Sequence, residues 1–196
     1  MCGICGFTGE IVDRSAVITH MTDVITHRGP DSSGVFEGDG VTMGFRRLSI
    51  IDISSTGDQP IENEDGSLVL TFNGEIYNYQ ELRKELMEKG HIFRTQTDSE
   101  VLIHGFEEWQ EGLLNRLRGM FGFAIWNKKD HSLFMARDFF GIKPLHYTMV
   151  GDHFVYGSEI KSILQFPGFE KKFNMDTLTN YLSFQYAVPP QTFFEG

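Results

Sequence analysis

The chain begins Met1-Cys2-Gly3-Ile4-Cys5-Gly6, and this stretch says most about both the fold and the chemistry. If Met1 is removed, Cys2 becomes the first residue and carries a thiol and a free α-amine. Unperturbed, the amine has a pKa of about 7.7–8.0 and the thiol one of about 8.5, so the amine can act as general base for the thiol. The run Gly3–Phe7 that follows is typical of a β-strand. The sequence therefore offers Cys2 as a candidate nucleophile activated by its own amine.

Other interpretations of the cysteines remain open at this point. A lone cysteine is usually a small buried hydrophobic residue. A Cys-x-x-Cys redox pair normally opens a helix, whereas Gly6-Phe7-Thr8-Gly9 is typical of a strand running into a turn, and strand positions 2 and 5 point to opposite faces. Two cysteines without a second pair or a spaced histidine pair make a poor zinc site. A dyad of Cys2 with His27 is conceivable, but no local spacing selects His27 among the seven histidines.

The composition indicates a folded domain. A chain of 196 residues can bury roughly 70% of its unfolded surface, and 40% apolar with 22% charged residues is a globular composition. The net charge of −10 argues against non-specific binding to nucleic acid or anionic membranes. No apolar run approaches the ~18 residues of a membrane span, and the first basic residue is Arg14, unlike a signal peptide. We therefore expect a soluble cytoplasmic protein.

Short β-type runs alternate with four stretches of helical spacing, which predicts an α+β domain whose helices cover sheet faces. Thr97-Asp98-Ser99-Glu100 has the form of a capping box at the start of the third helix, and Gly90 stands at the expected C-cap of the second. The expected strands are Gly3–Phe7, Val41–Phe45, Leu68–Phe72, Phe121–Trp126, Ser132–Ala136 and His153–Tyr156, and the helical faces are Val17/Met21/Val24, Tyr79/Leu82/Leu86, Leu102/Gly105/Phe106/Trp109 and Met175/Leu178/Leu182.

The stretch around Asn73-Gly74 has two interpretations. Asn-Gly between the runs Leu68–Phe72 and Glu75–Tyr79 is a strong β-hairpin signal, and from pattern alone we expect a tight turn here. A turn could also present its amides to a ligand, so a role in binding is compatible with the same pattern.

Taken together, these residues resemble a known family, the glutaminase domain of class II glutamine amidotransferases in its asparagine-synthetase form. The resemblance covers Met1 to Gly196, and the order and spacing of the motifs make it specific although no single motif is. Amidotransferases of amino-sugar and purine synthesis share the cysteine but look different around Arg47, Asn73 and Gly141. The motifs are Met1-Cys2-Gly3-Ile4, His27-Arg28-Gly29-Pro30-Asp31, Arg47-Leu48-Ser49-Ile50-Ile51-Asp52, Asn73-Gly74-Glu75-Ile76-Tyr77-Asn78, Thr97-Asp98-Ser99-Glu100, Ala136-Arg137-Asp138, Gly141-Ile142-Lys143-Pro144-Leu145 and Ser158-Glu159-Ile160-Lys161.

The resemblance implies an α+β fold, a four-layer αββα sandwich of the N-terminal nucleophile hydrolase type. Residues 1–185 would form the glutaminase domain and residues 186–196 the start of a linker to a synthetase domain absent from this chain. No cofactor or metal is expected within the 196 residues, which contain no Gly-x-x-x-x-Gly-Lys loop, whereas ATP and magnesium would serve the synthetase domain. The sequence departs from the family pattern at Cys5, His146 and Gln185.

The implied reaction is hydrolysis of glutamine to glutamate and ammonia through a γ-glutamyl thioester on Cys2. The Asn73 side chain and the Gly74 N–H would stabilise the oxyanion. The ammonia would pass to the C-terminal synthetase domain of the same polypeptide, which most simply makes asparagine from aspartate. A different acceptor, a catalytically silent binding or regulatory module of the same fold, and a homodimer stay open.

The resemblance also implies how the α-carboxylate and α-ammonium of glutamine are recognised. Arg47 would bind the carboxylate, and Glu75 and Asp98 the ammonium. Without the resemblance, Arg47 would be an ordinary surface charge and Asp98 a first-turn helix carboxylate, worth only about 0.3–1 kcal/mol. The Gly141–Leu145 and Ser158–Lys161 motifs look structural. The rest of the pocket wall would come from Leu48, Ser49, Ile50 and Ile51.

Overall fold

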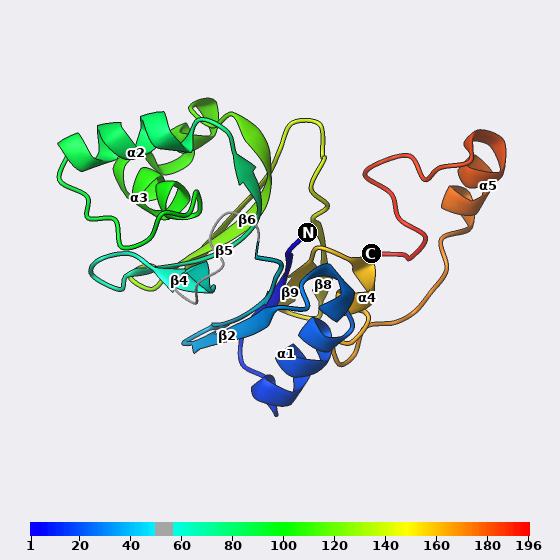
Figure 1. Cartoon of the computed structure of the whole chain (residues 1–196). Helices are drawn as coiled ribbons and strands as arrows, with labels where there is room; N and C mark the ends of the chain where they lie inside the picture. The colour runs from blue at the N-terminus through cyan, green and yellow to red at the C-terminus, as the bar shows by residue number, and fades with distance from the viewer. Residues whose placement is uncertain (50–56) are drawn as a thin grey trace.

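The computed structural model describes residues 1–49 and 57–196, which form two antiparallel sheets with helices on their outer faces (Figure 1). The first sheet has five strands in the order β2-β3-β1-β9-β8, and the second has four in the order β4-β5-β6-β7. The strands of the first sheet are β1 (Gly3–Thr8), β2 (Ser32–Gly38), β3 (Val41–Arg47), β8 (His146–Val150) and β9 (His153–Gly157). Those of the second are β4 (Ile61–Glu62), β5 (Leu68–Ile76), β6 (Gly119–Asn127) and β7 (Ser132–Arg137).

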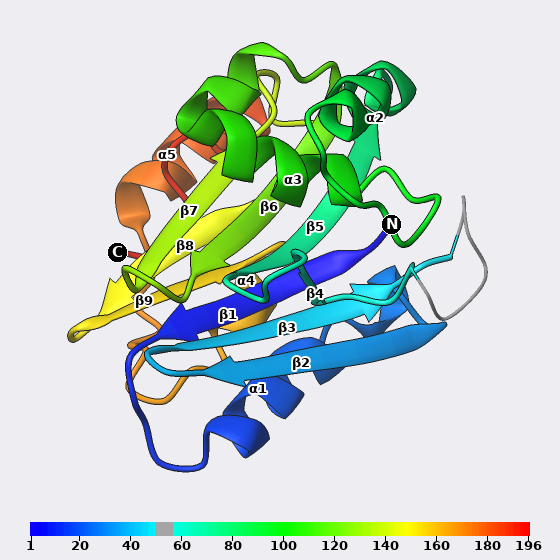
Figure 2. The ribbon, with the colours of Figure 1, turned by 90° about the vertical axis from the view of Figure 1, so that its left-hand side faces the viewer.

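The helices divide between the two outer faces. Helices α1 (Arg14–Asp23) and α4 (Ile160–Ile163) lie against the first sheet, and α2 (Tyr79–Glu88) and α3 (Glu100–Trp109) lie against the second (Figure 2). Helix α5 (Met175–Phe184) stands apart from both sheets in Figure 1. The 3₁₀-helices are η1 (Thr26–Arg28) and η3 (Gln110–Asn115). Among the residues described, no helix is long and apolar enough to cross a membrane.

Three buried apolar clusters fill the three interfaces between these layers. One joins the first sheet to α1, a second lies between the sheets, and the third joins the second sheet to α2 and α3. Strand β1 contributes to two of them because successive strand side chains point to opposite faces: Ile4 packs between the sheets, whereas Cys5 and Phe7 pack against α1. The expected αββα sandwich is confirmed.

The turn predicted at Asn73-Gly74 was wrong. Strand β5 runs through it without a break and pairs with β6 along its whole length, Asn73 opposite Gly122 and Gly74 opposite Phe121. A turn at this point would break the ladder and expose the buried apolar face of β5, so the tertiary pairing overrides the local Asn-Gly preference.

Of the two helix ends marked in the sequence, the C-terminal glycine of α2 was predicted correctly and the capping box of α3 was not. Helix α3 begins at Glu100, yet the Glu100 carboxylate accepts the N–H groups of Arg94 and Thr95 at 2.9 and 2.8 Å, so the capping box does not form. At the end of α2, Gly90 adopts a φ of 103°, and the His91 N–H donates to the carbonyl of Leu86 at 3.1 Å. This is a Schellman motif, as expected for a C-terminal glycine.

All six expected strands and all four expected helices are present, with β2, β4, β8 and α4 in addition. The apolar face predicted for the fourth helix, α5, is not buried: Met175 and Leu182 are 63% and 74% exposed. Gln185, noted above as a departure, follows α5 with a φ of 62°, a left-handed conformation that glycine adopts more readily. The domain boundary expected at residue 185 stays a prediction.

Gly74 is required in β5 by space. A Cβ there would collide with the carbonyl oxygen of Met120 and lie 2.8 Å from the Cα of Phe121, both backbone atoms that cannot move aside. We expect Gly74→Ala to lower the free energy of unfolding by roughly 1–3 kcal/mol, as overpacking does. Gly112→Ala, whose Cβ would have Trp109 as its nearest neighbour at 3.9 Å, is the control and should stay within about 0.5 kcal/mol of the parent chain in denaturant titrations. Equal stability of the two variants would contradict this reading of β5.

Candidate active site

A cavity of about 130 Å³ lies beside the N-terminal end of β1 and the exposed edge of β5. Figure 2 shows the N-terminus at this end of the two sheets. Residues far apart in the sequence meet here, and most of them are buried. The walls of the cavity are formed by Met1, Cys2, Phe45, Arg47, Leu48, Gly57, Gln59, Phe72, Asn73, Gly74, Glu75, Thr97, Asp98, Ser99, Met120 and Lys143.

The backbone at Cys2 and directly after it is fixed by hydrogen bonds with other parts of the chain. Arg28 Nε donates to the Cys2 carbonyl at 2.9 Å, and the Ile4 N–H donates to Ser158 Oγ at 3.0 Å. The thiol itself lies beside Leu48, whose N–H donates to Cys2 Sγ at 3.4 Å. Arg28 and Ser158, from two of the motifs, thus hold the start of β1 so that Cys2 faces the cavity.

Burial raises the pKa of the Cys2 thiol above its ordinary value. The Leu48 N–H, the N-terminal ammonium group and Arg47 act in the opposite direction, and the carboxylate of Asp98 adds to the rise. Since only the thiolate is a strong nucleophile, a thiol in this environment needs a base at the moment it reacts.

The alternatives to a nucleophilic Cys2 find no support in the geometry. Both cysteines are free thiols, and Cys5 is fully buried on the opposite face of β1, where burial raises its pKa. His27 is half exposed, lies 2.9 Å from Glu159 through its Nε2, and is not among the residues that line the cavity. Neither residue is placed to act on the Cys2 thiol.

The edge of β5 supplies hydrogen-bond donors to the cavity. Alternate N–H groups of a strand point the same way, and those of Phe72 and Ile76 are accepted by Gln59 Oε1 at 2.6 Å and Asp98 Oδ2 at 2.8 Å. The N–H of Gly74 lies between them and points to the same edge. Its neighbour Asn73 is 1% exposed, and its Nδ2 finds no partner within the described ranges. The Asn73 side-chain amide and the Gly74 N–H are therefore two donors in the cavity wall, and the Asn73 Nδ2 has no acceptor among the described residues.

A buried cation and a buried carboxylate also line the cavity. Arg47 is held by Asp58, with Nη1 2.9 Å from Oδ1. Burial raises the pKa of Asp98 to about 6, with a further rise from the nearby Glu75 and a partial offset from the Ile76 N–H. Glu75 is itself exposed and lines the cavity. The cavity can thus pair with both ends of a zwitterion.

The expected contribution of residues 48–51 to the pocket is only partly visible in the described residues. Leu48 lines the cavity, but Ser49 does not, and its N–H donates to Asp31 Oδ2 at 2.7 Å. Ile50 and Ile51 lie outside the described residues.

Sequence reasoning missed several residues of the cavity wall. Gln59 holds the edge of β5 through the Phe72 N–H, and no motif marked it. Lys143 lies in the Gly141–Leu145 motif, whose backbone is fixed by Asp138, and its Nζ is 3.2 Å from Met1 Sδ. The Gly141–Leu145 motif drew attention to Lys143, but the sequence could not show that its side chain lines the cavity, because that depends on the tertiary structure.

A four-layer αββα sandwich whose first strand starts beside a cysteine-lined cavity defines a fold of the N-terminal nucleophile hydrolase type. Two solved structures share it: glutamine phosphoribosylpyrophosphate amidotransferase from B. subtilis (TM-score 0.70, 22% identity, 83% of this chain and 43% of that one) and the allosteric regulatory enzyme of purine biosynthesis (TM-score 0.71, 23% identity, 84% and 43%).

Residues 1–196 match the family described as the glutamine amidotransferase domain, and the chain belongs to that family. It is 45% identical over 197 residues to asparagine synthetase [glutamine-hydrolyzing] 1 of Bacillus subtilis (strain 168), covering 96% of this chain and 31% of that protein. To the rice (Oryza sativa subsp. japonica) asparagine synthetase [glutamine-hydrolyzing] 2 it is 41% identical over 168 residues, 83% of this chain and 28% of that protein. The chain thus spans about a third of the length of these relatives.

Proposed function

We propose that this domain hydrolyses L-glutamine to glutamate and ammonia through a γ-glutamyl thioester on Cys2. The observation that carries the proposal is the arrangement of one cavity, in which the Cys2 thiol, the unpartnered Asn73 amide and the Gly74 N–H lie together with Arg47 and Asp98. A nucleophile, oxyanion donors and a pair of opposite charges are the groups that attack on an amide of an amino acid requires.

The proton transfers depend on removal of Met1. The free amine of Cys2 then takes the proton from the thiol as sulfur attacks the amide carbon, and it gives that proton to the departing ammonia. Water next attacks the thioester, the amine accepts its proton, and glutamate leaves as the thiol is restored. The raised pKa of the thiol makes this base necessary.

Met1 also lines the cavity, with its sulfur beside Lys143. Its removal therefore opens space for the substrate as well as freeing the amine. In a chain that keeps Met1, the nitrogen of Cys2 is an amide, which cannot act as a base.

The Asn73 Nδ2 and the Gly74 N–H would stabilise the oxyanion of the tetrahedral intermediate. Each such donor is worth about 2.7–4 kcal/mol when it is held in place before the reaction. Asn73 is positioned by the strand ladder and Gly74 by the close approach of β6, so neither has to move.

The two ends of glutamine would bind along the same cavity. The Arg47 guanidinium would donate two parallel hydrogen bonds to the α-carboxylate, and Asp98, assisted by Glu75, would bind the α-ammonium. The Leu48 N–H contacts the Cys2 sulfur at 3.4 Å, and Cys2, Arg47 and Leu48 all line the cavity, which supports one substrate reaching both the thiol and the guanidinium.

The ammonia would be used by an ATP-dependent synthetase domain of the same polypeptide, with asparagine from aspartate as the most direct product. Support comes from the names of the relatives and from the third of their length that this chain spans. Phe139, Phe140 and Ile142 are 95%, 82% and 54% exposed in the loop next to Lys143 and offer an apolar surface to that domain. Residues 1–185 would be the glutaminase and 186–196 the beginning of the linker. Two free thiols fit a reducing cytoplasm.

Replacing the nucleophile tests the reaction, and Cys5 provides the matched control. Cys2→Ala should abolish glutamate release from glutamine, because the attacking atom is gone. Cys5→Ala, on the other face of β1, should keep glutaminase turnover, although loss of the buried sulfur lowers stability. Both are measured with protein shown by intact mass to lack Met1. Substantial turnover by Cys2→Ala, or its loss in folded Cys5→Ala, would refute the mechanism.

Two adjacent arginines test substrate recognition. Arg47→Lys keeps the charge but not the bidentate geometry and should lower kcat/KM roughly 10- to 150-fold, the equivalent of 1.5–3 kcal/mol for a hydrogen bond to a charged group. Arg46→Lys is the control, because Arg46 points to the other face of β3, where it contacts Asp23 and the Thr22 carbonyl. Its kcat/KM should change by no more than about twofold. An equal loss of kcat/KM in the two variants would show that Arg47 does not bind glutamine.

The raised pKa of Asp98 predicts how glutamine binding depends on pH. The ammonium pairs only with the ionised carboxylate, so the Kd for glutamine should be flat above pH 7 and rise about tenfold per unit below about pH 6. Calorimetry on Cys2→Ala measures binding without turnover. Asp98→Asn, whose amide oxygen can still accept the Ile76 N–H, should bind weakly at every pH. A wild-type-like Kd in Asp98→Asn, or no pH dependence in the parent, would contradict this role.

A further inference from the structure

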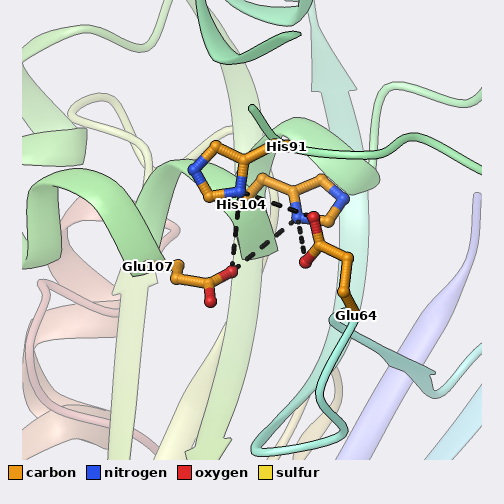
Figure 3. Close-up of side chains that lie close together, drawn as sticks. All are labelled: Glu64, His91, His104 and Glu107. Atoms are coloured by element: carbon orange, nitrogen blue, oxygen red, sulfur yellow. Dashed lines mark ion pairs between the residues drawn. The ribbon is translucent and has the colours of Figure 1, made fainter. Parts of the chain in front are cut away.

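Two histidines and two glutamates gather on the helical side of the four-stranded sheet, outside the cavity just described (Figure 3). Glu64 comes from the turn between β4 and β5, and His91 follows the end of α2. His104 and Glu107 are three residues apart on α3 and therefore share a face of that helix. The spacing in sequence predicted no metal site, since three separate elements contribute the residues.

The distances between these side chains suit a metal ion. Ligand atoms bound tetrahedrally to zinc at ~2.0–2.2 Å are about 3.3–3.6 Å from one another. His104 Nδ1 lies 3.1 Å from Glu64 Oε2 and 3.9 Å from Glu107 Oε2, and His91 Nδ1 lies 3.5 Å from Glu64 Oε1 and 3.7 Å from Glu107 Oε2. One ligand atom from each of the four lies within 4.8 Å of all the others. Small side-chain rotations would complete a tetrahedron.

His104 supplies an independent indication of a ligand. It is 2% exposed, and neither of its ring nitrogens has a hydrogen-bond partner within the described chain. Oε2 of Glu64 is unpartnered as well, because its short distance to Nδ1 lacks hydrogen-bond geometry. Buried polar atoms without a partner destabilise the fold, and an ion bound to His104 Nδ1 and Glu64 Oε2 would give both atoms a partner.

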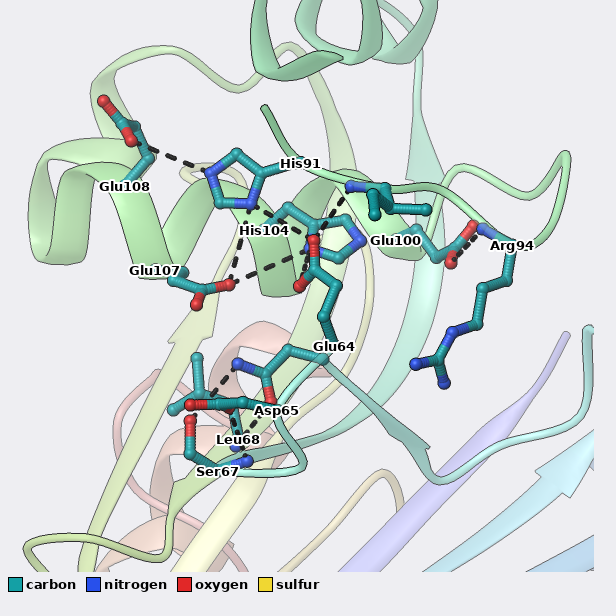
Figure 4. Close-up of polar contacts among 12 residues, drawn as sticks. Glu64, Asp65, Ser67, Leu68, His91, Arg94, Glu100, His104, Glu107 and Glu108 are labelled. Atoms are coloured by element: carbon teal, nitrogen blue, oxygen red, sulfur yellow. Dashed lines mark hydrogen bonds and ion pairs between the residues drawn. The ribbon is translucent and has the colours of Figure 1, made fainter. Parts of the chain in front are cut away.

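A second group of contacts orients two of the four side chains, Glu64 and His91 (Figure 4). The Ile92 N–H donates to Glu64 Oε1 at 2.9 Å, and the Schellman turn fixes the backbone of His91. The second ring nitrogen of His91, Nε2, lies 3.7 Å from Glu108 Oε2. Glu108 is in turn held by Lys89, whose Nζ is 2.6 Å from Glu108 Oε1. A carboxylate behind a histidine is the arrangement that sets the tautomer of metal-binding histidines.

We propose that Glu64, His91, His104 and Glu107 form a structural site for one divalent transition-metal ion, with zinc the best match. Two carboxylates balance the charge of the ion, and two imidazoles with two carboxylates are ligands of the type that zinc accepts. The ion would tie the β4–β5 turn to the α2–α3 layer. Helix α3 begins directly after Asp98 and Ser99, so the tie would also steady one wall of the cavity.

The test uses Co²⁺ and Zn²⁺ as probes on the 196-residue chain carrying Cys2→Ala, so that the exposed thiol cannot bind metal. After dialysis against a chelator, the protein should bind one equivalent of Co²⁺ with the intense visible absorption of a tetrahedral site, and Zn²⁺ should displace it. Zn²⁺ should also raise Tm in proportion to the logarithm of its concentration.

His91→Gln and Glu107→Gln should each weaken Zn²⁺ binding at least 10- to 100-fold, since even outer partners of a metal site contribute about that much. His131→Gln is the control, because His131 has a single carboxylate nearby, Asp39 at 3.9 Å, and is outside the cluster. Circular dichroism confirms that each variant folds. Failure to bind a stoichiometric ion, or equal affinity in the parent and both folded ligand variants, would overturn the proposal and leave the cluster as a set of ion pairs.

Discussion

The central position of β1 is the constraint on which the rest of the structure depends. Its backbone pairs with β3 on one side and β9 on the other, and its side chains alternate between two apolar clusters. Because the side-chain period of a strand is two, a shift by one residue would exchange the faces of Ile4 and Cys5 and turn Cys2 away from the cavity. The packing that stabilises the sandwich is therefore also what aims the thiol.

The free edge of β5 meets a second physical requirement. Beyond the two residues paired with β4, the strand presents N–H groups that no strand of the described residues accepts. Gln59 and Asp98 accept two of them with side chains, and the Gly74 N–H lies between these two on the same edge, beside the cavity. The proposed oxyanion donor therefore lies on a sheet edge whose flanking N–H groups are paired by side chains, in keeping with the rule that buried backbone donors are paired.

Much of the secondary structure was predictable because its signals are local. Period-two and helical spacing located the main strands and helices, and Gly90 marked a helix end correctly. Strand β2 was not predicted because Ser32–Gly38 is a polar edge strand with alternating burial. Helix α4 was not predicted because it is only one turn long. Asn73-Gly74 was wrongly predicted to form a turn, because no local sequence signal indicates the nine-residue pairing of β5 with β6.

The candidate site was predictable only through resemblance. Arg47 ends β3, Asn73 and Gly74 lie in β5, and Asp98 precedes α3. No spacing rule brings these three parts of the chain beside Cys2; the fold does so. Gln59, Lys143 and the histidine cluster around His104 depend on the same long-range packing, so sequence patterns did not reveal their surroundings.

We propose above that Cys2, once its amine is free, is the nucleophile of a glutamine pocket. Incubation with a glutamine analogue that carries an electrophilic carbon in place of the side-chain amide, followed by intact mass and peptide mapping, tests it most directly. The account predicts one adduct, on Cys2, formed only by chains lacking Met1 and blocked by excess glutamine. An adduct on Cys5, or equal labelling of chains that retain Met1, would contradict it.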